Sequence, residues 1–66
     1  MKVDIGDIWM ISMGPSWTPH HVLVTGFSTS PIKYRGYDLV ADIIILEYNT
    51  TTKVYIQSIT EGKKLA

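Results

Sequence analysis

The sequence predicts a small all-β domain, for two reasons. β-Branched residues, which favour extended strands, are frequent: the 66 residues include nine Ile, five Val and seven Thr. No segment repeats apolar residues at the 3.6-residue spacing of an amphipathic helix over three turns. Hydrophobic residues make up 45% of the chain, which is enough for a folded core, and the length allows one domain, residues 1–66.

Two strands are expected in the first half of the chain. The first covers residues 7–13, an apolar and β-branched run that ends at Gly14 and Pro15, which interrupt strands. The second covers residues 20–27, after a short loop. Residues 28–38 contain a proline, a glycine and several hydroxyl side chains, so we expect them to form the longest connection, a surface loop.

The second half of the chain is expected to add a hairpin and an edge strand. Residues 39–48 form the strongest strand pattern, and residues 49–52 turn the chain back, because asparagine tolerates left-handed backbone angles. Residues 53–58 form the returning strand, and residues 59–66 are long enough for a turn and a fifth strand at an edge. Four to five short antiparallel strands cannot build two full sheets, so the economical architecture is a small SH3-like barrel.

The third expected strand carries large apolar side chains on both faces. Alternation places Ile43 and Ile45 on one face and Ile44 and Leu46 on the other. Leaving Ile43 and Ile45 exposed would forgo about 1.5–3 kcal/mol each. We therefore expect these two residues at an interface with a protein partner or with a second copy in a homo-oligomer. The alternative is that a loop, such as residues 28–38, covers them.

Charge and composition exclude several classes of function. Six basic residues balance six acidic ones, so no net field attracts nucleic acid or an anionic membrane. The absence of cysteine excludes a disulfide scaffold, a cysteine nucleophile and a zinc ribbon. The first residues are partly acidic where a signal peptide is apolar, and no apolar run approaches the roughly 18 residues of a membrane span. We therefore expect a cytoplasmic protein without a membrane partner.

The sequence shows no catalytic or metal-binding pattern. His20 and His21 are the only imidazoles, and neighbouring residues of a strand point to opposite faces, so the two cannot address one site. They lack further histidines or cysteines to complete a tetrahedral metal site. No spacing singles out a carboxylate pair, and the five glycines are isolated rather than grouped in a phosphate loop. We therefore expect a protein that has no enzymatic activity and binds no cofactor. We also expect one of the two histidines to pack at the edge of the core.

Functional side chains concentrate instead in two aromatic segments. One reads Gly-Pro-Ser-Trp-Thr-Pro-His at residues 14–20, and the other reads Ile-Lys-Tyr-Arg-Gly-Tyr at residues 32–37. Tryptophan, tyrosine and arginine bury a large area at low entropic cost, so they mark binding surfaces. Trp17 either contacts a partner or caps the open end of the barrel. The binding residues predicted from these segments are Trp17, His20, Tyr34, Arg35 and Tyr37.

Residues 4–58 resemble small SH3-like barrels of the KOW and related classes. The resemblance rests on Gly-Asp-Ile-Trp at residues 6–9, on His-Val-Leu-Val at residues 21–24 and on an apolar strand that turns at Tyr48 and Asn49. Such barrels are common among short phage-encoded and host-accessory proteins. The resemblance implies a binding module that acts on another protein or on nucleic acid.

The first half of the chain also resembles the opening of MazF-like ribonuclease toxins. In that family a Gly-Asp-Ile-Trp strand leads through a loop into a Pro-x-x-Val-Leu-Val strand, and residues 19–24 follow this outline. Thr18 stands where the family places an arginine, and the chain is far shorter, so we do not expect ribonuclease activity.

Together these patterns predict a non-enzymatic binding module. Its expected setting is a phage or mobile element, where it binds a host protein and inhibits or adapts it, including in anti-phage defence. One alternative is an oligomer that sequesters a small nucleotide-like ligand, with its base on Trp17, Tyr34 and Tyr37 and its phosphate on Arg35. The less favoured alternative is a KOW-like module that binds RNA or DNA through Lys33, Arg35, Lys53, Lys63 and Lys64.

Overall fold

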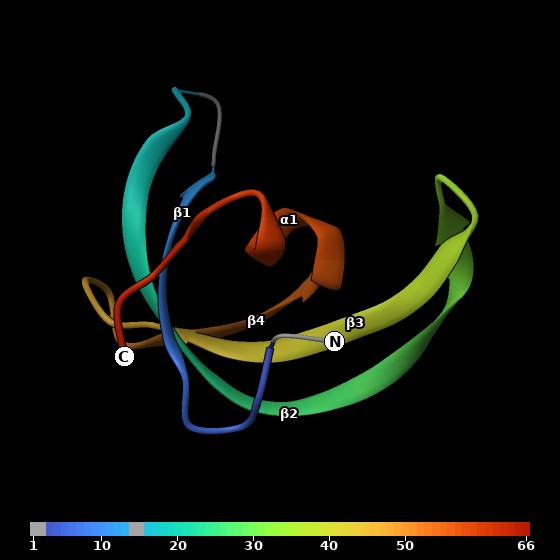
Figure 1. The fold of residues 1–66 in the computed structure, drawn as a ribbon, viewed down its shortest axis with the longest axis horizontal. Coiled ribbons are helices and arrows are strands. Elements are labelled where there is room, and N and C mark those ends of the chain that lie inside the picture. Colours follow the sequence, from blue (N-terminus) through green and yellow to red (C-terminus); the bar gives the residue numbers. More distant parts are fainter. Residues whose placement is uncertain (1–2, 14–15) are drawn as a thin grey trace.

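The chain folds into a curved antiparallel sheet with one short helix on its inner side (Figure 1). The computed structural model describes residues 3–13 and 16–66, so the strand breakers expected at Gly14 and Pro15 lie outside the described residues, as does the Tyr34 side chain. The all-β prediction is confirmed. In chain order the elements are β1 (Ile8–Met13), β2 (Thr18–Tyr34), β3 (Tyr37–Ile45), β4 (Thr50–Tyr55), α1 (Ile56–Thr60) and β5 (Lys63–Lys64).

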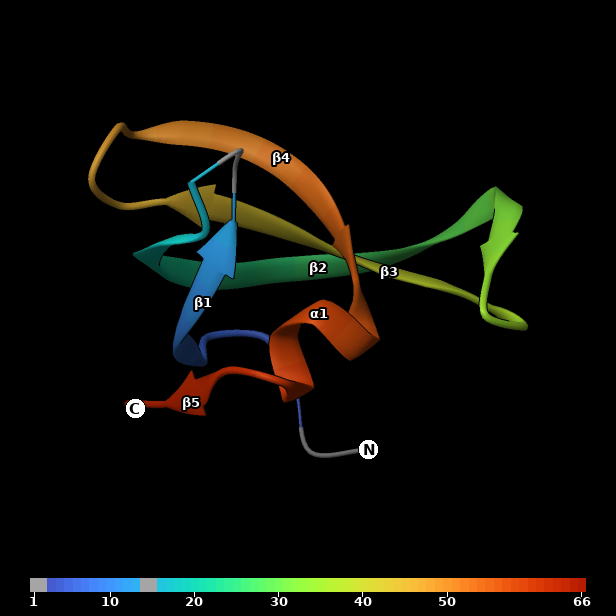
Figure 2. The ribbon, with the colours of Figure 1, turned by 90° about the horizontal axis from the view of Figure 1, so that it is seen from above.

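The strands lie in the order β4-β3-β2-β1-β5, so β4 and β5 form the two edges of the sheet. The expected fifth strand is present as β5, which pairs with β1 through Trp9 and Lys64. Among the described residues no strand pairing joins β4 to β5, and the chain passes from one edge to the other through α1 (Figure 2). The sheet is strongly bent rather than closed by a continuous ladder, and the relationship to SH3-like barrels stays a prediction.

The prediction of a long loop at residues 28–38 is wrong, because β2 continues to Tyr34 and β3 begins at Tyr37. Only Arg35 and Gly36 form the turn, with φ angles of 53° and 82°. Two left-handed residues match the twist of a tight hairpin, and glycine adopts such angles without a steric penalty. Pro31, which has no N–H to donate, falls within an irregular stretch of the β2–β3 pairing between Thr29 and Tyr34.

The turn expected at residues 49–52 lies three residues earlier, at 46–49, and residues 50–52 belong to β4. Asn49 keeps the expected left-handed backbone, with a φ of 52°. Contacts with β2 hold the turn: the Leu46 N–H donates to the His21 carbonyl over 2.8 Å, and the His21 N–H donates to the Glu47 carboxylate over the same distance. The returning strand also ends early, because residues 56–60 form α1.

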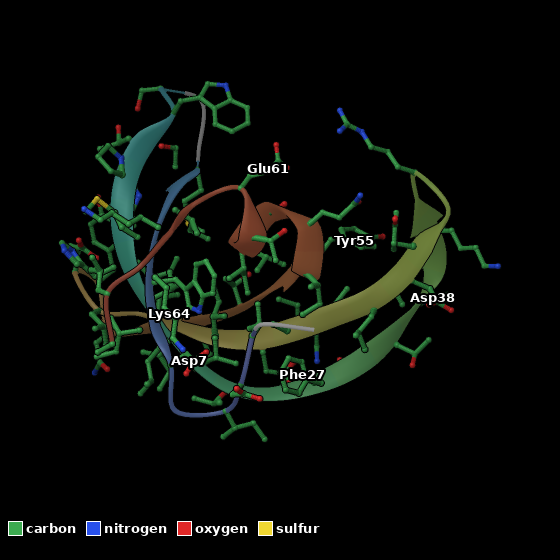
Figure 3. All side chains as sticks on the ribbon, in the orientation of Figure 1. Asp7, Phe27, Asp38, Tyr55, Glu61 and Lys64 are labelled. Carbon is green, nitrogen blue, oxygen red and sulfur yellow. The ribbon has the colours of Figure 1, made fainter. Side chains whose placement is uncertain are left out.

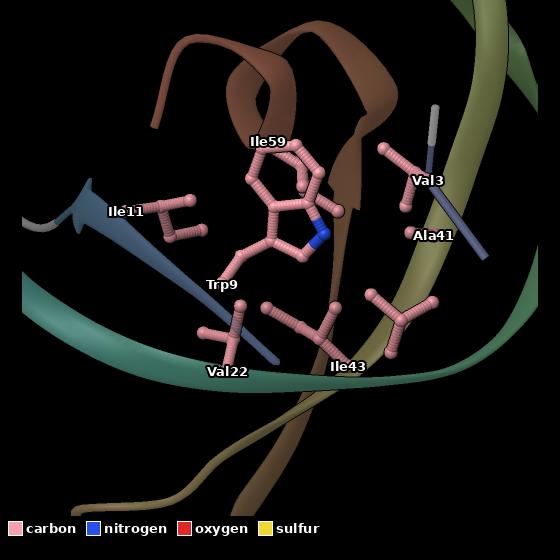
Figure 4. Close-up of a cluster of buried hydrophobic side chains, with 8 residues drawn as sticks. Val3, Trp9, Ile11, Val22, Ala41, Ile43 and Ile59 are labelled. Atoms are coloured by element: carbon pink, nitrogen blue, oxygen red, sulfur yellow. The ribbon is translucent and has the colours of Figure 1, made fainter. Parts of the chain in front are cut away.

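The core lies between the inner face of the sheet and α1 (Figure 4). Alternation along β1 sends Trp9 and Ile11 inward, and Ile59 of α1 closes the core from the opposite side with no exposed surface. The buried hydrophobic cluster consists of Val3, Trp9, Ile11, Val22, Val24, Ala41, Ile43 and Ile59.

The burial of Ile43 corrects the expected interface at this residue, whereas Ile45 is only partly buried. Ile43 is 1% exposed and belongs to the core, and Ile45 packs against the same cluster. The alternative prediction was that another part of the same chain covers this face of β3. Val3 and Ile59 provide this cover at Ile43, rather than residues 28–38. The burial of Ile43 therefore removes the reason for placing a partner or a second copy against it.

Candidate binding site

A cavity of about 690 Å³ brings together two of the predicted binding residues, Trp17 and Arg35. Trp17 directly precedes β2, and Arg35 directly follows it. The two ends of this long strand lie on either side of α1, because β2 bends sharply along its length (Figure 1). A register shift between Val24 and Gly26 marks a bulge, which is a usual cause of such bending. The remaining lining residues are Met10, Ser12, Pro19, Ser58, Glu61, Gly62 and Lys63.

Trp17 is presented to solvent rather than packed into the protein. Its side chain is 73% exposed, whereas Trp9 fills the core at 6%. This exposure does not fit a cap over the open end of the sheet. Trp17 and Arg35 also share left-handed backbone angles, with φ of 52° and 53°. Such angles are unfavourable for side chains of this size, and strained residues cluster at ligand-binding sites.

Several polar side chains line the cavity without a protein partner. Within residues 3–13 and 16–66, no hydrogen bond or ion pair involves the hydroxyls of Ser12 and Ser58, the Trp17 indole N–H or the charged ends of Glu61 and Lys63. Glu61 follows α1, on the open side between the two ends of β2 (Figure 3). The cavity therefore collects donors and acceptors that a ligand can use.

Two other predicted cations are already paired with carboxylates. Lys53 of β4 donates to Asp42 over 2.5 Å, and the Lys64 ammonium lies 3.7 Å from the Asp7 carboxylate. The Lys53–Asp42 ion pair joins β4 to β3, which is an interior strand of the sheet. Arg35 and Lys63 share the cavity, so the five cations expected to form a nucleic-acid surface do not all lie in one place.

His20 does not belong to this surface, because it is 8% exposed and packs at the edge of the core. Its Nδ1 lies 2.7 Å from the Thr18 carbonyl oxygen, which can only accept, so Nδ1 donates. Its Nε2 is left to accept from the Tyr48 hydroxyl at 3.5 Å, and the two rings lie 5.3 Å apart. The expectation that one histidine packs at the core edge is met by His20, whereas its predicted role as a contact residue is not supported by this position.

His21 points to the opposite side and pairs with Glu47, a residue that sequence reasoning did not single out. The His21 Nδ1 lies 2.6 Å from a Glu47 carboxylate oxygen, and the His21 main-chain N–H donates to both carboxylate oxygens. The hydrogen bonds from His21 hold the pKa of Glu47 below its ordinary value. This pair ties the β3–β4 turn to β2. The described part of the chain contains no group of three His, Asp or Glu residues placed to hold a metal ion.

The remaining predicted contacts lie near the β2–β3 turn. Tyr37 is 57% exposed and Ile32 is 72% exposed, so both add apolar surface beside Arg35. Neither lines the cavity. The side chain of Tyr34 lies outside the described part of the structure, although its backbone pairs with Tyr37.

Sequence reasoning missed Ser58 and Glu61 as cavity residues and considered Lys63 only as a nucleic-acid contact. These residues reach the cavity through α1 and β5, about 40 residues along the chain from Trp17. No local sequence pattern predicts that these residues reach the cavity, because their position depends on how the C-terminal segment crosses from β4 to β1.

No helix in the described ranges is long and apolar enough to cross a membrane. In comparisons with known proteins, the chain matches no protein-family model, and neither a curated protein nor a solved structure is significantly similar to it.

Proposed function

We propose that this protein is a non-enzymatic binding module that contacts a protein partner through the two ends of β2. The supporting observation is the exposure of large apolar side chains at both ends: Trp17 at one, Ile32 and Tyr37 at the other. Grouped exposed apolar residues mark interaction surfaces, and tryptophan, tyrosine and arginine dominate the energy of protein interfaces. Arg35 lies between the residues of the second end and adds a charged, hydrogen-bonding group.

The proposed setting is a phage or mobile element, with a host protein as the partner that is inhibited or adapted, including in anti-phage defence. The resemblance of residues 4–58 to short phage-encoded barrels supports this setting.

Site-specific photo-crosslinking in host cells tests this function. A photoreactive phenylalanine analogue replaces Trp17 or Tyr37, and a third variant carries it at Thr51, an exposed residue of β4, as the matched control. We expect one protein to be crosslinked from positions 17 and 37 and not from position 51. The proposal is refuted if positions 17 and 37 do not both crosslink the same protein, or if position 51 gives the same products.

The purified partner then allows the contribution of Trp17 to be measured. Trp17→Asn is the appropriate variant, because asparagine tolerates the left-handed backbone and removes the ring. Loss of a central aromatic contact costs about 2 kcal/mol or more, so we expect the dissociation constant to rise about 30-fold. Thr51→Asn serves as the control, with an unchanged constant.

A further inference from the structure

The cavity between the two ends of β2 combines three chemical features that a ligand can use. Trp17 supplies a flat aromatic ring, Arg35 and Lys63 supply positive charge, and the hydroxyls of Ser12 and Ser58 supply hydrogen bonds. All five residues line the same space, although they come from β1, from both ends of β2 and from the C-terminal segment.

Charge in the cavity favours an anion. Two cations, Arg35 and Lys63, and one carboxylate, Glu61, give the lining a formal charge of +1, whereas the whole chain has a net charge of 0. Lys63 makes no ion pair within the described residues, in contrast to Lys53 and Lys64. A guanidinium and an ammonium are the groups that proteins use to hold phosphate.

The volume of the cavity and the chemistry of its lining narrow the class of ligand further. A volume of about 690 Å³ lies in the range of small-molecule sites and exceeds what a single inorganic anion fills. An anion alone would leave the Trp17 ring unused, and an uncharged aromatic molecule would leave the net positive charge of the lining unbalanced. A nucleotide uses both, because its base stacks on an aromatic side chain while its phosphate binds cations.

We propose that this cavity binds a mononucleotide. The base stacks on Trp17, the phosphate lies between Arg35 and Lys63, and Glu61 accepts hydrogen bonds from the ribose hydroxyls. This site differs from the oligomeric nucleotide site considered from the sequence, since it is formed within one chain and does not include Tyr37 among its lining residues.

The nucleotide site and the proposed protein contact can be tested separately. Trp17 belongs to both surfaces, but Lys63 belongs to the cavity and Tyr37 to the end of β2 beyond it. A Lys63 variant therefore reports on the nucleotide, and a crosslink from position 37 reports on the protein partner. Failure of one leaves the other standing.

Titration of the ¹⁵N-labelled chain, followed by two-dimensional NMR, tests the site. The probes are AMP, GMP, CMP and UMP, with the matching nucleosides and inorganic phosphate as partial ligands. We expect at least one mononucleotide to shift the Trp17 indole N–H and the Arg35 and Lys63 amides saturably, about tenfold or more tightly than its nucleoside or phosphate. The indole N–H of Trp9, which lies in the core near Asp7, is the internal control and should not move.

Matched variants locate the binding. Lys63→Gln and Trp17→Asn should each weaken nucleotide binding about tenfold or more, whereas Lys33→Gln, which removes an exposed cation outside the cavity, should change it less than about twofold. If the NMR spectrum shows that Lys63→Gln disturbs the fold, Arg35→Asn takes its place as the variant that removes a positive charge from the cavity. The proposal is overturned if no mononucleotide saturates by about 10 mM, if phosphate alone binds equally well, or if Lys33→Gln weakens binding as much as Lys63→Gln.

Discussion

Replacing Gly62 by alanine should destabilise the fold strongly, because the residue lies where α1 leads into β5 against β1. A Cβ atom at this position would lie 2.7 Å from a methyl carbon of Ile11 and 3.2 Å from the carbonyl oxygen of Ile59, and still closer to the carbonyl oxygen of Met10. Two of these three neighbours are backbone atoms, which cannot rotate away. The methyl group therefore fits only if β5 moves off β1 or α1 shifts.

The size of this effect follows from the contacts that would be lost. Forcing a methyl group into a packed interior costs about 1–3 kcal/mol. Moving β5 would also strain the pairing of Met10 with Lys63, and each backbone hydrogen bond contributes about 1 kcal/mol. We expect a loss of about 3 kcal/mol, a large part of the roughly 3–10 kcal/mol available to a domain of this size. The midpoint of thermal unfolding should fall by about 12–24 °C.

Urea unfolding followed by circular dichroism measures this loss, with Gly36→Ala as the matched control. A Cβ at Gly36 meets nothing within 4 Å, so this variant suffers only from its φ of 82°, a cost of about 1–2 kcal/mol. Equal losses for the two variants, or a loss below about 1 kcal/mol for Gly62→Ala, would show that the α1–β5 connection yields easily and that the reasoning is wrong.

Three further changes test other parts of the structure. Ile43→Ala should cost about 2–5 kcal/mol, and its thermal midpoint should fall equally at about 5 and 500 μM protein; a loss that grows on dilution would instead place Ile43 at an interface. The main-chain N–H of Asp4 donates to the Asp7 carboxylate and is the chief cause that lowers the pKa of Asp7 in the folded chain. The ionised carboxylate therefore stabilises the fold at a pH above its ordinary pKa of about 4, and this stabilisation is lost as the pH falls through the lower pKa of the folded state. Asp7→Asn should flatten stability between about pH 4 and pH 2 in urea titrations, and an unchanged slope would contradict this assignment. Gln57→Met should be neutral or stabilising by up to about 1 kcal/mol, since Oε1 of Gln57 is buried without a partner among the described residues; a loss above that would indicate a hydrogen bond to this oxygen.

The strands that sequence reasoning placed best are those with a local signal. The strands predicted at residues 7–13 and 39–48 correspond to β1 (Ile8–Met13) and, apart from its first two residues and the turn at 46–49, to β3 (Tyr37–Ile45), because side-chain alternation and strand propensity act within each segment. The same reasoning mistook residues 28–38 for a loop. Pro31 and Gly36 do interrupt regular pairing, but the β2–β3 hairpin accommodates them in an irregular stretch and a two-residue turn.

The candidate site was predicted in part, since Trp17 and Arg35 were identified as binding residues by their chemistry. Their meeting across one cavity depends on the bend of β2, and the contributions of Ser58 and Lys63 depend on the path of α1 and β5. These are relations between distant segments, which residue type and spacing do not encode locally.

The sequence by itself determined the all-β class, a single small domain and the residue types available for binding, because composition and alternation act locally along the chain. Only the tertiary structure decided how Ile43 is covered: Val3 and Ile59 pack in the same buried cluster, so this residue is covered from within the chain. It also decided that His20 is buried while Trp17 stays exposed beside a cavity. The physical reason is that burial depends on which distant segments pack together, and in this chain the curvature of β2 and the crossing of α1 set that packing.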